Sequence, residues 1–253
     1  MLPEFGEKGQ ECLAAGRVLI IGAGGPGSSA AIYLTTAGIG TIGIADPDKV
    51  ELSNPQPIHA GSRPGMLKTE SAKLTMNSLN PDTRVICYNE KINASNIKDI
   101  ITDKNYDFII DAADNFQTKY IINDACVLLK KPFSHGSVQG LDGRLMTYIP
   151  GKGPCCRCVF EKPPETAYVE TMHAETACDD AAREFRETGY GENGTHVVVP
   201  DIIGTLQAAE AIKYLLGMDN LLNGYILSYN ALSMEFGKIR VERNIDCAVC
   251  GKK

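Results

Sequence analysis

The sequence has no excess of positive charge, and this absence narrows the classes of partner. Its 253 residues hold 25 lysines and arginines against 31 aspartates and glutamates, which gives a formal net charge of −6 and a pI near 5.3. Without a basic field, the chain lacks the long-range attraction that nucleic acids and anionic lipids exert on their binding proteins. We therefore expect neither nucleic acid nor membrane among its partners.

Long apolar runs are lacking too. No stretch approaches the ~20 apolar residues that a membrane-spanning helix needs. The first eight residues do not combine a basic patch with a following apolar stretch, so they do not read as a secretory signal, and no internal repeat is present. From these absences we expect a cytoplasmic protein, whose length suits one α/β domain with an elaboration.

A glycine-rich turn between two buried strands carries the most chemical information. Residues 18–21 form a short apolar run that is typical of a strand buried on both faces, and the spacing Gly22-x-Gly24-x-x-Gly27 follows directly. A second apolar run, 41–45, ends at Asp46. The alternative is a purely structural turn. Strand, glycines, helix, strand and acid instead predict nucleotide binding, with phosphate at the glycines and helix N-terminus and a ribose hydroxyl on the acid.

Strands and helices alternate along the first half of the chain. This alternation predicts an α/β fold with a doubly wound, mostly parallel, Rossmann-like sheet. The second half of the chain is expected to add antiparallel strands and, from the cysteine pairs described below, a zinc knuckle. A hairpin is expected at the sheet edge, a loop at 47–65, and a long polar loop at 161–196. Strands are expected at 18–21, 41–45, 84–88, 106–110, 132–139, 143–149, 224–229 and 234–241, and helices at 7–15, 26–37, 66–79, 94–102, 116–129 and 200–216.

Two C-x-x-C pairs lie far apart among the nine cysteines. Cys155 and Cys158 follow the expected hairpin, and Cys247 and Cys250 lie near the end of the sequence. Two such pairs supply four thiolates for a tetrahedral zinc ion, which would tie the tail to the middle of the chain. Cys156 is an alternative to Cys155 as a ligand, and separate redox-active or free cysteines are the alternative to zinc.

The remaining cysteines give weaker signals. Cys12, Cys87 and Cys126 fall within helix or strand patterns and are most simply small core residues. Cys178 lies in the polar segment beside two aspartates, whose charges do not favour a thiolate. An exposed loop thiol is the simpler interpretation of Cys178, and a nucleophile is the alternative.

Further segments accompany the glycine-rich turn in a fixed order. They are the run from Arg17 to Gly27, Asp46-x-Asp48 with Leu52-Ser53-Asn54, Lys68-x-Glu70, Asp111-Ala-Ala-Asp114-Asn115, the two cysteine pairs, and the stretch 204–213. In this order they resemble the ubiquitin-activating, E1-like superfamily, in its ThiF/MoeB/HesA branch, over almost the whole chain. The resemblance implies one adenylation domain, 1–253, with a nucleotide-binding half, 1–140, and a second half, 141–253, that holds the crossover loop, the zinc knuckle and the carrier-binding surface.

The resemblance also implies an activity. Members of this family are homodimers that bind ATP and Mg²⁺ and adenylate a carboxylate, usually the C-terminal glycine of a small ubiquitin-like sulfur-carrier protein that ends in Gly-Gly. A separate sulfur donor protein then converts the acyl-adenylate to a thiocarboxylate, in thiamine, molybdopterin or related biosynthesis.

Residue roles follow from the resemblance by position. The catalytic candidates are Asp114 on Mg²⁺, Lys68 near the triphosphate, and Cys178 as a nucleophile, although the family's cysteine lies closer to the 204–213 helix. A lysine and a magnesium ion suit the reaction, because two anions must be brought together. The structural alternatives are a solvated lysine at a helix start and an aspartate that caps the 116–129 helix. The expected nucleotide-binding residues are Gly22, Gly24, Gly25, Asp46, Asp48, Asn54, Gln56, Arg63, Lys68, Asp114 and Asn115.

Two arginines of the family pattern are missing. The family typically has an arginine just after Ser-Asn-x-Gln, where this chain has Pro57, and the next arginine is Arg63. The family's upstream Arg-Tyr-x-Arg-Gln-like segment is not in this sequence, which begins after it. A second hypothesis is therefore a degenerate E1-like binding protein with weak or no adenylation. A third is an NAD-dependent oxidoreductase, which needs the glycines and Asp46 but neither Lys68 nor the cysteine pairs.

Overall fold

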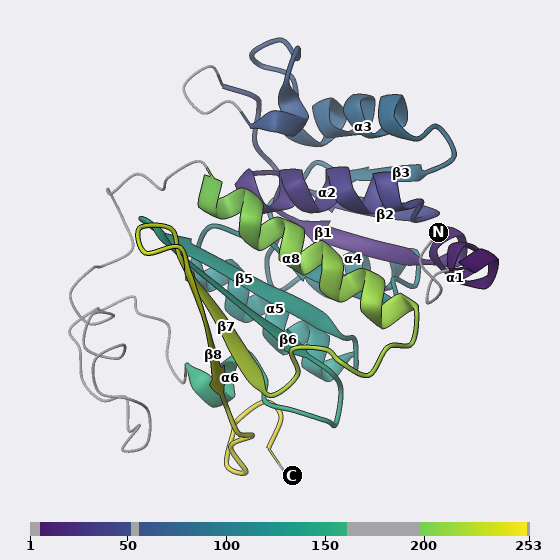
Figure 1. Ribbon diagram of the computed structural model, residues 1–253. Helices are drawn as coiled ribbons and strands as arrows, with labels where there is room; N and C mark the ends of the chain where they lie inside the picture. The colour runs from purple at the N-terminus through teal and green to yellow at the C-terminus, as the bar shows by residue number, and fades with distance from the viewer. Residues whose placement is uncertain (1–5, 52–55, 161–197, 252–253) are drawn as a thin grey trace.

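A single twisted sheet forms the centre of the molecule. The structure is a computed structural model that describes residues 6–51, 56–160 and 198–251. In these residues eight strands pair in the order β3-β2-β1-β4-β5-β6-β7-β8 (Figure 1). The strands are β1 (Arg17–Ile21), β2 (Thr41–Ala45), β3 (Arg84–Tyr88), β4 (Phe108–Asp111), β5 (Phe133–Gln139), β6 (Asp142–Tyr148), β7 (Tyr225–Asn230) and β8 (Glu235–Arg240).

The sheet is parallel in its first half and antiparallel in its second. β1 pairs with β2 on one side and with β4 on the other, and β2–β3 and β4–β5 are parallel as well. The chain order reverses at β1, so the switch point of the sheet lies between β1 and β4. In open α/β sheets, ligands bind at the carboxyl ends of the strands at such a point.

The antiparallel part corrects one expectation. β5 and β6 form the expected hairpin, but β6 also pairs with β7, and β7 with β8, so the hairpin lies inside the sheet. The edge beyond it is β8. Sequence patterns predict the hairpin, whereas its place in the sheet depends on β7, which begins only at Tyr225 although β6 ends at Tyr148.

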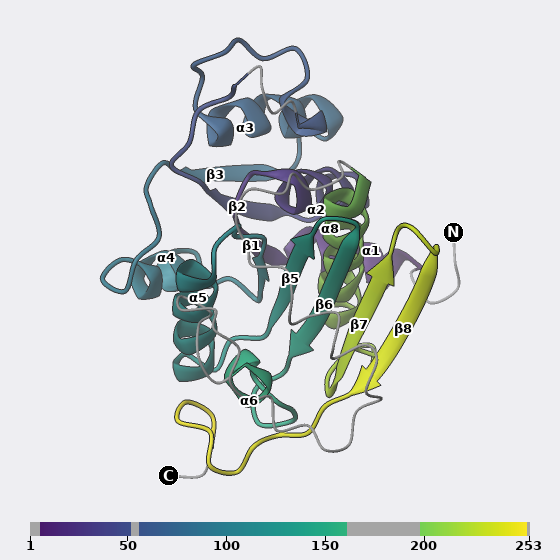
Figure 2. The ribbon, with the colours of Figure 1, turned by 90° about the vertical axis from the view of Figure 1, so that its left-hand side faces the viewer.

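Helices cover both faces of the parallel half. In Figure 2, α2 and α8 lie on one side of the sheet, whereas α4 and α5 lie on the other. α3 packs on α2 and β3 at the end of the sheet, and α1 contacts α8. The helices are α1 (Gly6–Ala15), α2 (Gly25–Ala37), α3 (Lys68–Leu79), α4 (Ile97–Asp103), α5 (Phe116–Leu128), α6 (Cys156–Val159) and α8 (Val198–Leu215), with a 3₁₀ turn η1 (Pro57–His59).

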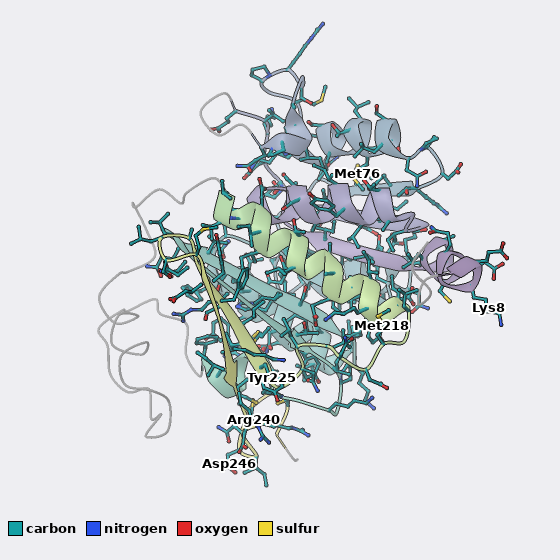
Figure 3. The ribbon with its side chains drawn as sticks, in the orientation of Figure 1. Lys8, Met76, Met218, Tyr225, Arg240 and Asp246 are labelled. Carbon is teal, nitrogen blue, oxygen red and sulfur yellow. The ribbon has the colours of Figure 1, made fainter. Side chains whose placement is uncertain are left out.

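Alternating strand residues divide the core into two clusters. On β1, Val18 and Ile20 belong to the cluster under α2 and α8, and Leu19 and Ile21 belong to the cluster under α4 and α5. Both sets are almost fully buried, which explains why β1 reads as an unbroken apolar run. Met76 of α3, also fully buried, lies toward α2 (Figure 3).

The expected helices are all found, with shifted ends. α4 starts three residues later than expected, because Asn93 and Asn96 form a turn in which Asn96 accepts from the Asn93 N–H and Asn93 accepts from Ser95. The expected polar loop at 161–196 lies outside the described residues. In the part of the chain that is described, no helix combines the length and the apolar character that a bilayer crossing requires.

Replacing Gly27 with alanine should destabilise the protein. The added methyl would lie 1.8 Å from the Gly22 carbonyl oxygen, so α2 would have to move away from the turn. We expect Gly27→Ala to lower the Tm by roughly 2–12 °C, as overpacking costs of about 1–3 kcal/mol imply. Gly24→Ala is the matched control, because its methyl meets open space. Equal Tm shifts in both variants, measured without nucleotide, would contradict this account of the close contact.

Candidate functional site

The glycine-rich turn connects β1 to α2 and leaves open space at its centre. Gly22 has a φ of +105°, and a side chain there would strike the Ala112 carbonyl of the β4–α5 connection. A Cβ on Gly24, by contrast, would meet nothing within 4 Å. The turn therefore packs against the neighbouring strand end at Gly22 and opens at Gly24, at the N-terminus of α2, where an anion is favoured.

Asp46, directly after β2, fixes this turn. Its side chain is buried, its Oδ2 accepts from the Ala23 N–H at 2.7 Å, and its Oδ1 accepts from the Asp48 N–H at 2.8 Å. Each carboxylate oxygen has a second lone pair. The carboxylate can therefore hold the turn in place and still accept from a ribose hydroxyl.

Lys68 lies among acidic residues at the start of α3. Its ammonium donates to Asp48 Oδ2 at 3.0 Å, and its side chain is only 18% exposed. Burial opposes the charge, but the bond to Asp48 and the charges of Asp46, Asp48 and Asp114 raise the pKa of Lys68 overall. The interpretation of Lys68 as a solvated lysine is wrong for this structure, since its side chain is largely buried and paired with Asp48.

Asp114 and Asn115 lie between β4 and α5. The helix cap is Asn115, whose side-chain oxygen accepts from the Thr118 N–H at 2.9 Å, so the interpretation of Asp114 as the cap is wrong. Asn115 also donates to Asp114 Oδ1 at 3.0 Å. Asp114 is exposed. Asn115 thus positions a carboxylate that has oxygen lone pairs to offer a divalent cation.

The other residues expected at the site are Gly25, Gln56, Asn54, Arg63 and Cys178. A Cβ on Gly25 would lie 2.4 Å from the Pro200 side chain and 3.5 Å from Gln56 Oε1, so both residues line the helix start. Arg63 is exposed and forms no ion pair within the described residues, and its role in nucleotide binding stays a prediction. Asn54 and Cys178 lie outside the described residues.

His59 supports the site and was not found from sequence. Its Nε2–H donates to the Ala23 carbonyl at 2.9 Å, and its Nδ1 accepts from the Ser71 hydroxyl at the same distance. Burial lowers the pKa of His59, which favours this neutral form. A lone histidine in a loop rich in proline and glycine gives no signal that it bonds to the glycine-rich turn.

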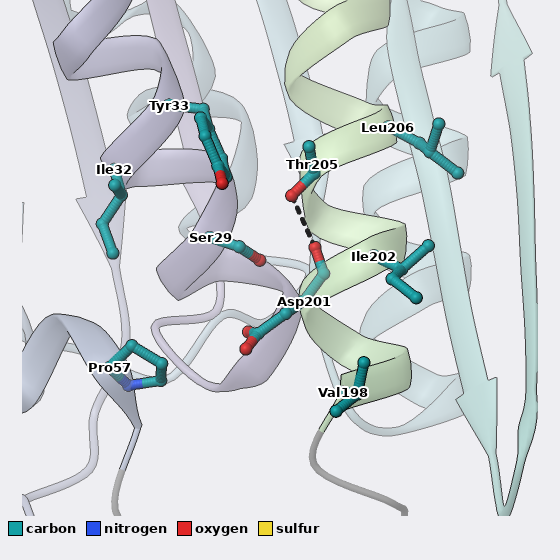
Figure 4. Close-up of a pocket in the computed structure, with 9 residues that line it drawn as sticks. All are labelled: Ser29, Ile32, Tyr33, Pro57, Val198, Asp201, Ile202, Thr205 and Leu206. Atoms are coloured by element: carbon teal, nitrogen blue, oxygen red, sulfur yellow. Dashed lines mark hydrogen bonds between the residues drawn. The ribbon is translucent and has the colours of Figure 1, made fainter. Parts of the chain in front are cut away.

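A cavity of about 380 Å³ flanks the turn on the α8 side (Figure 4). Ser29, Ile32 and Tyr33 of α2 face Asp201 and Thr205 of α8 across it, and Thr205 donates to the Asp201 carbonyl at 2.7 Å. Its lining is mainly apolar and includes neither Asp46 nor Lys68. The cavity is therefore separate from the polar cluster described above.

The four cysteines of the two C-x-x-C pairs come together at the base of α6. Their sulfur atoms lie within 4.8 Å of one another, with Cys155–Cys247 at 3.7 Å and Cys158–Cys250 at 3.2 Å. A tetrahedral zinc with Zn–S bonds of about 2.3 Å requires sulfur separations near ~3.8 Å. The arrangement is consistent with a zinc knuckle, and Cys155 is the residue that lies with the other three cysteines.

Cys156 lies elsewhere, so its candidacy as a ligand is wrong. It is buried, and its backbone N–H donates to Asn123 of α5 at 2.9 Å. The neighbouring Arg157 forms a bidentate pair with Asp124 of α5, at 2.7 and 2.8 Å. The zinc knuckle is thereby attached to the helix that begins at Asn115.

The three cysteines expected in the core differ from one another. Cys126 is buried as expected, and Cys87 is half-buried, with a pKa raised to about 11 by burial. Cys12 is exposed, so its assignment to the core is wrong. The helical pattern of residues 7–15 places Leu13 rather than Cys12 against the sheet.

Comparison with known proteins agrees with this arrangement. A sequence model described as the ThiF family matches residues 1–249. The adenylyltransferase and sulfurtransferase MOCS3 of Drosophila virilis is 39% identical over 254 residues, which is 99% of this chain and 52% of the relative. The MOCS3 protein of Drosophila willistoni is 38% identical over 258 residues, with coverage of 100% and 52%. The chain spans about half the length of the curated relatives it matches.

Solved structures show the same fold at low sequence identity. Escherichia coli MccB, in a crystal structure with ATP, gives a TM-score of 0.77 at 22% identity, covering 96% of this chain and 68% of that one. PaaA gives 0.71 at 20% identity, with coverage of 93% and 67%. At these identities the likeness concerns the fold alone.

We predict that the four-cysteine cluster binds zinc. The purified protein should contain about one zinc per chain, and Cys247→Ser with Cys250→Ser should remove most of it and lower the Tm. Emission spectroscopy of the metal content and thermal unfolding provide the measurements. Cys12→Ser is the control, because that thiol is exposed and away from the cluster. Equal zinc contents in all three proteins would refute the assignment.

His59 should make stability depend on pH. Unfolded histidine binds a proton near pH ~6.5, whereas burial lowers the pKa of folded His59. The unfolded state therefore binds more protons below that pH, so the stability from neutral His59 is complete above it and is lost as pH falls toward the folded pKa. Between about pH 7.5 and pH 5.5, the Tm of His59→Gln should fall less than that of the unaltered protein. The same fall in both would argue against this role.

Proposed function

This chain belongs to the ThiF family, and from that membership we propose that it is an adenylyltransferase that uses ATP and Mg²⁺. The substrate in this proposal is the C-terminal carboxylate of a small ubiquitin-like sulfur-carrier protein that ends in Gly-Gly. Supporting it are the relatives named adenylyltransferase and sulfurtransferase. A sulfur donor protein, a homodimer, a cytoplasmic location, and a division into halves 1–140 and 141–253 belong to the same proposal.

One observation carries the activity. Lys68 donates to Asp48 and interacts electrostatically with Asp46, which like Asp48 follows β2, and with Asp114, which follows β4. A hydride-transferring dehydrogenase needs only the turn and the acid after β2. A lysine and additional carboxylates at the same edge instead suit a triphosphate and its metal ion.

The residues can divide the work of adenylation among them. The Gly24–Gly25 turn binds phosphate oxygens through backbone N–H groups, and Asp46 accepts from the ribose. Lys68 shields the negative charge of the phosphates as the substrate carboxylate approaches the α-phosphorus and pyrophosphate leaves. Asp114, with Asp48 nearby, would hold Mg²⁺, which when bound neutralises charge on the phosphates. Little covalent chemistry is required of the protein.

The exposed edge of the sheet supports a protein substrate. β8 pairs with β7 on one side and with nothing among the described residues on the other. Phe236 and Ile239 on this strand, and Leu232 and Met234 in the turn before it, are 40–80% exposed. An edge strand with exposed apolar side chains suits the addition of another chain's strand. A β-rich carrier domain is such a partner.

Adenylation is tested by ATP–pyrophosphate exchange. We expect exchange to require a ubiquitin-fold protein ending in Gly-Gly, and to fall at least about 100-fold in Asp114→Ala and in Lys68→Met, in line with the loss of one preorganised electrostatic contact. Lys91→Met is the matched control for the loss of a lysine, because Lys91 is exposed in the β3–α4 loop.

The opposite results are equally informative. ATP binding without exchange, under conditions of saturating carrier, would favour the degenerate binding protein, for which Pro57 and the exposed Arg63 are the motivation. A thermal shift with NAD that exceeds the shift with ATP and Mg²⁺ would favour an oxidoreductase. Full exchange in Asp114→Ala would remove that residue from the proposed mechanism.

A further inference from the structure

A buried charged cluster lies next to the candidate site and has no role in the adenylation step proposed above. Asp111, the last residue of β4, is completely buried. Its carboxylate pairs with the Lys119 ammonium of α5 at 3.3 Å and with His135 Nδ1 of β5 at 2.7 Å. The Ala113 N–H donates to the same carboxylate at 3.1 Å. Lys119 also donates to the Gly136 carbonyl, so this lysine is fixed in place.

These contacts determine the protonation of His135. A carboxylate can only accept, so the proton of the neutral ring lies on Nδ1, and Nε2 carries a free lone pair. Burial and the Lys119 charge lower the pKa of His135, against the opposite effect of Asp111, and the ring is neutral. The nearby Cys126 of α5 and Cys156 of α6 add no charge, because burial raises both thiol pKa values.

The cluster holds His135 at the same level of the sheet as the start of the glycine-rich turn. Ile21 of β1 is paired with Asp111 of β4, and Asp111 with His135 of β5. Two strand spacings of about 4.8 Å separate His135 from the residue before Gly22, roughly 10 Å across the carboxyl end of the sheet. Nε2 has no hydrogen-bond partner in the described residues, and the side chain is 10% exposed.

We propose that His135 is the general base of acyl transfer, accepting at Nε2 the proton of a thiol or persulfide that attacks the acyl-adenylate. This inference rests on the proposed adenylation. A sulfur–carbon bond forms at the acyl carbon, the carbon–oxygen bond to AMP breaks, and AMP leaves with the electron pair. The sulfhydryl proton passes to Nε2 and then to water. Asp111 acts through His135 by fixing its tautomer, the arrangement by which carboxylates orient catalytic histidines.

His135→Asn separates this role from a structural one. The asparagine amide can donate from the place of Nδ1, which preserves the bond to Asp111, but it offers no base. We expect ATP–pyrophosphate exchange within about 2-fold of the unaltered protein, while single-turnover conversion of the acyl-adenylate to a thioester, with dithiothreitol as the probe thiol, falls about 100-fold or more. Ser134→Ala, on the same strand with a buried hydroxyl that has no partner in the described structure, should leave both rates unchanged.

Three results would contradict the proposal. Normal exchange with normal thioester formation in His135→Asn overturns the role of His135 as a base. Equal losses in both rates overturn it as well, in favour of a structural role. Absence of exchange in the unaltered chain overturns the proposed adenylation and this inference with it. If His135→Asn does not fold, His135→Gln is measured in the same two assays and decided by the same outcomes.

Discussion

The two hydrogen bonds that Asp46 accepts are the constraint on which the rest of the site depends. One comes from Ala23 in the glycine-rich turn and the other from Asp48 in the loop after β2. A single buried carboxylate therefore fixes the glycine-rich turn relative to the loop that carries Asp48. Lys68 donates to Asp48, and its backbone N–H bonds to the Asp48 carbonyl, so α3 is attached to the same point. The carboxylate of Asp46 and the side chain and carbonyl of Asp48 thus connect three segments, the glycine-rich turn, the loop after β2 and the start of α3.

The sheet explains why residues from distant segments converge. β1, β2 and β4 are parallel neighbours, so the turns after them meet at one edge, where their carboxyl ends bring Gly24, Asp48 and Asp114 together. The zinc knuckle is connected to this edge through α5, since Arg157 and Cys156 bond to Asp124 and Asn123 of the helix that Asn115 caps. The four-cysteine cluster and the edge of the sheet that carries the glycine-rich turn are thus parts of one packed unit.

Much of this could be predicted from sequence because the relevant signals are local. Short apolar runs, glycine spacing and C-x-x-C pairs each depend on neighbours a few residues away, and the parallel sheet, α2 and the cysteine cluster all agreed with expectation. What failed was long-range. The position of the β5–β6 hairpin within the sheet and the contacts of His59 and His135 are decided by packing between segments that lie far apart in the chain.

The absence of a side chain at Gly25 joins the start of α2 to α8. The Pro200 side chain of α8 occupies the space that a Cβ on Gly25 would fill, so the start of α2 and the first turn of α8 are in contact. Close-packed interiors have little room for independent adjustment. A displacement of the first turn of α8 therefore requires a displacement of the start of α2, and of the open turn at Gly24 with it. The absence of one Cβ thus makes the glycine-rich turn and the first turn of α8 a single mechanical unit.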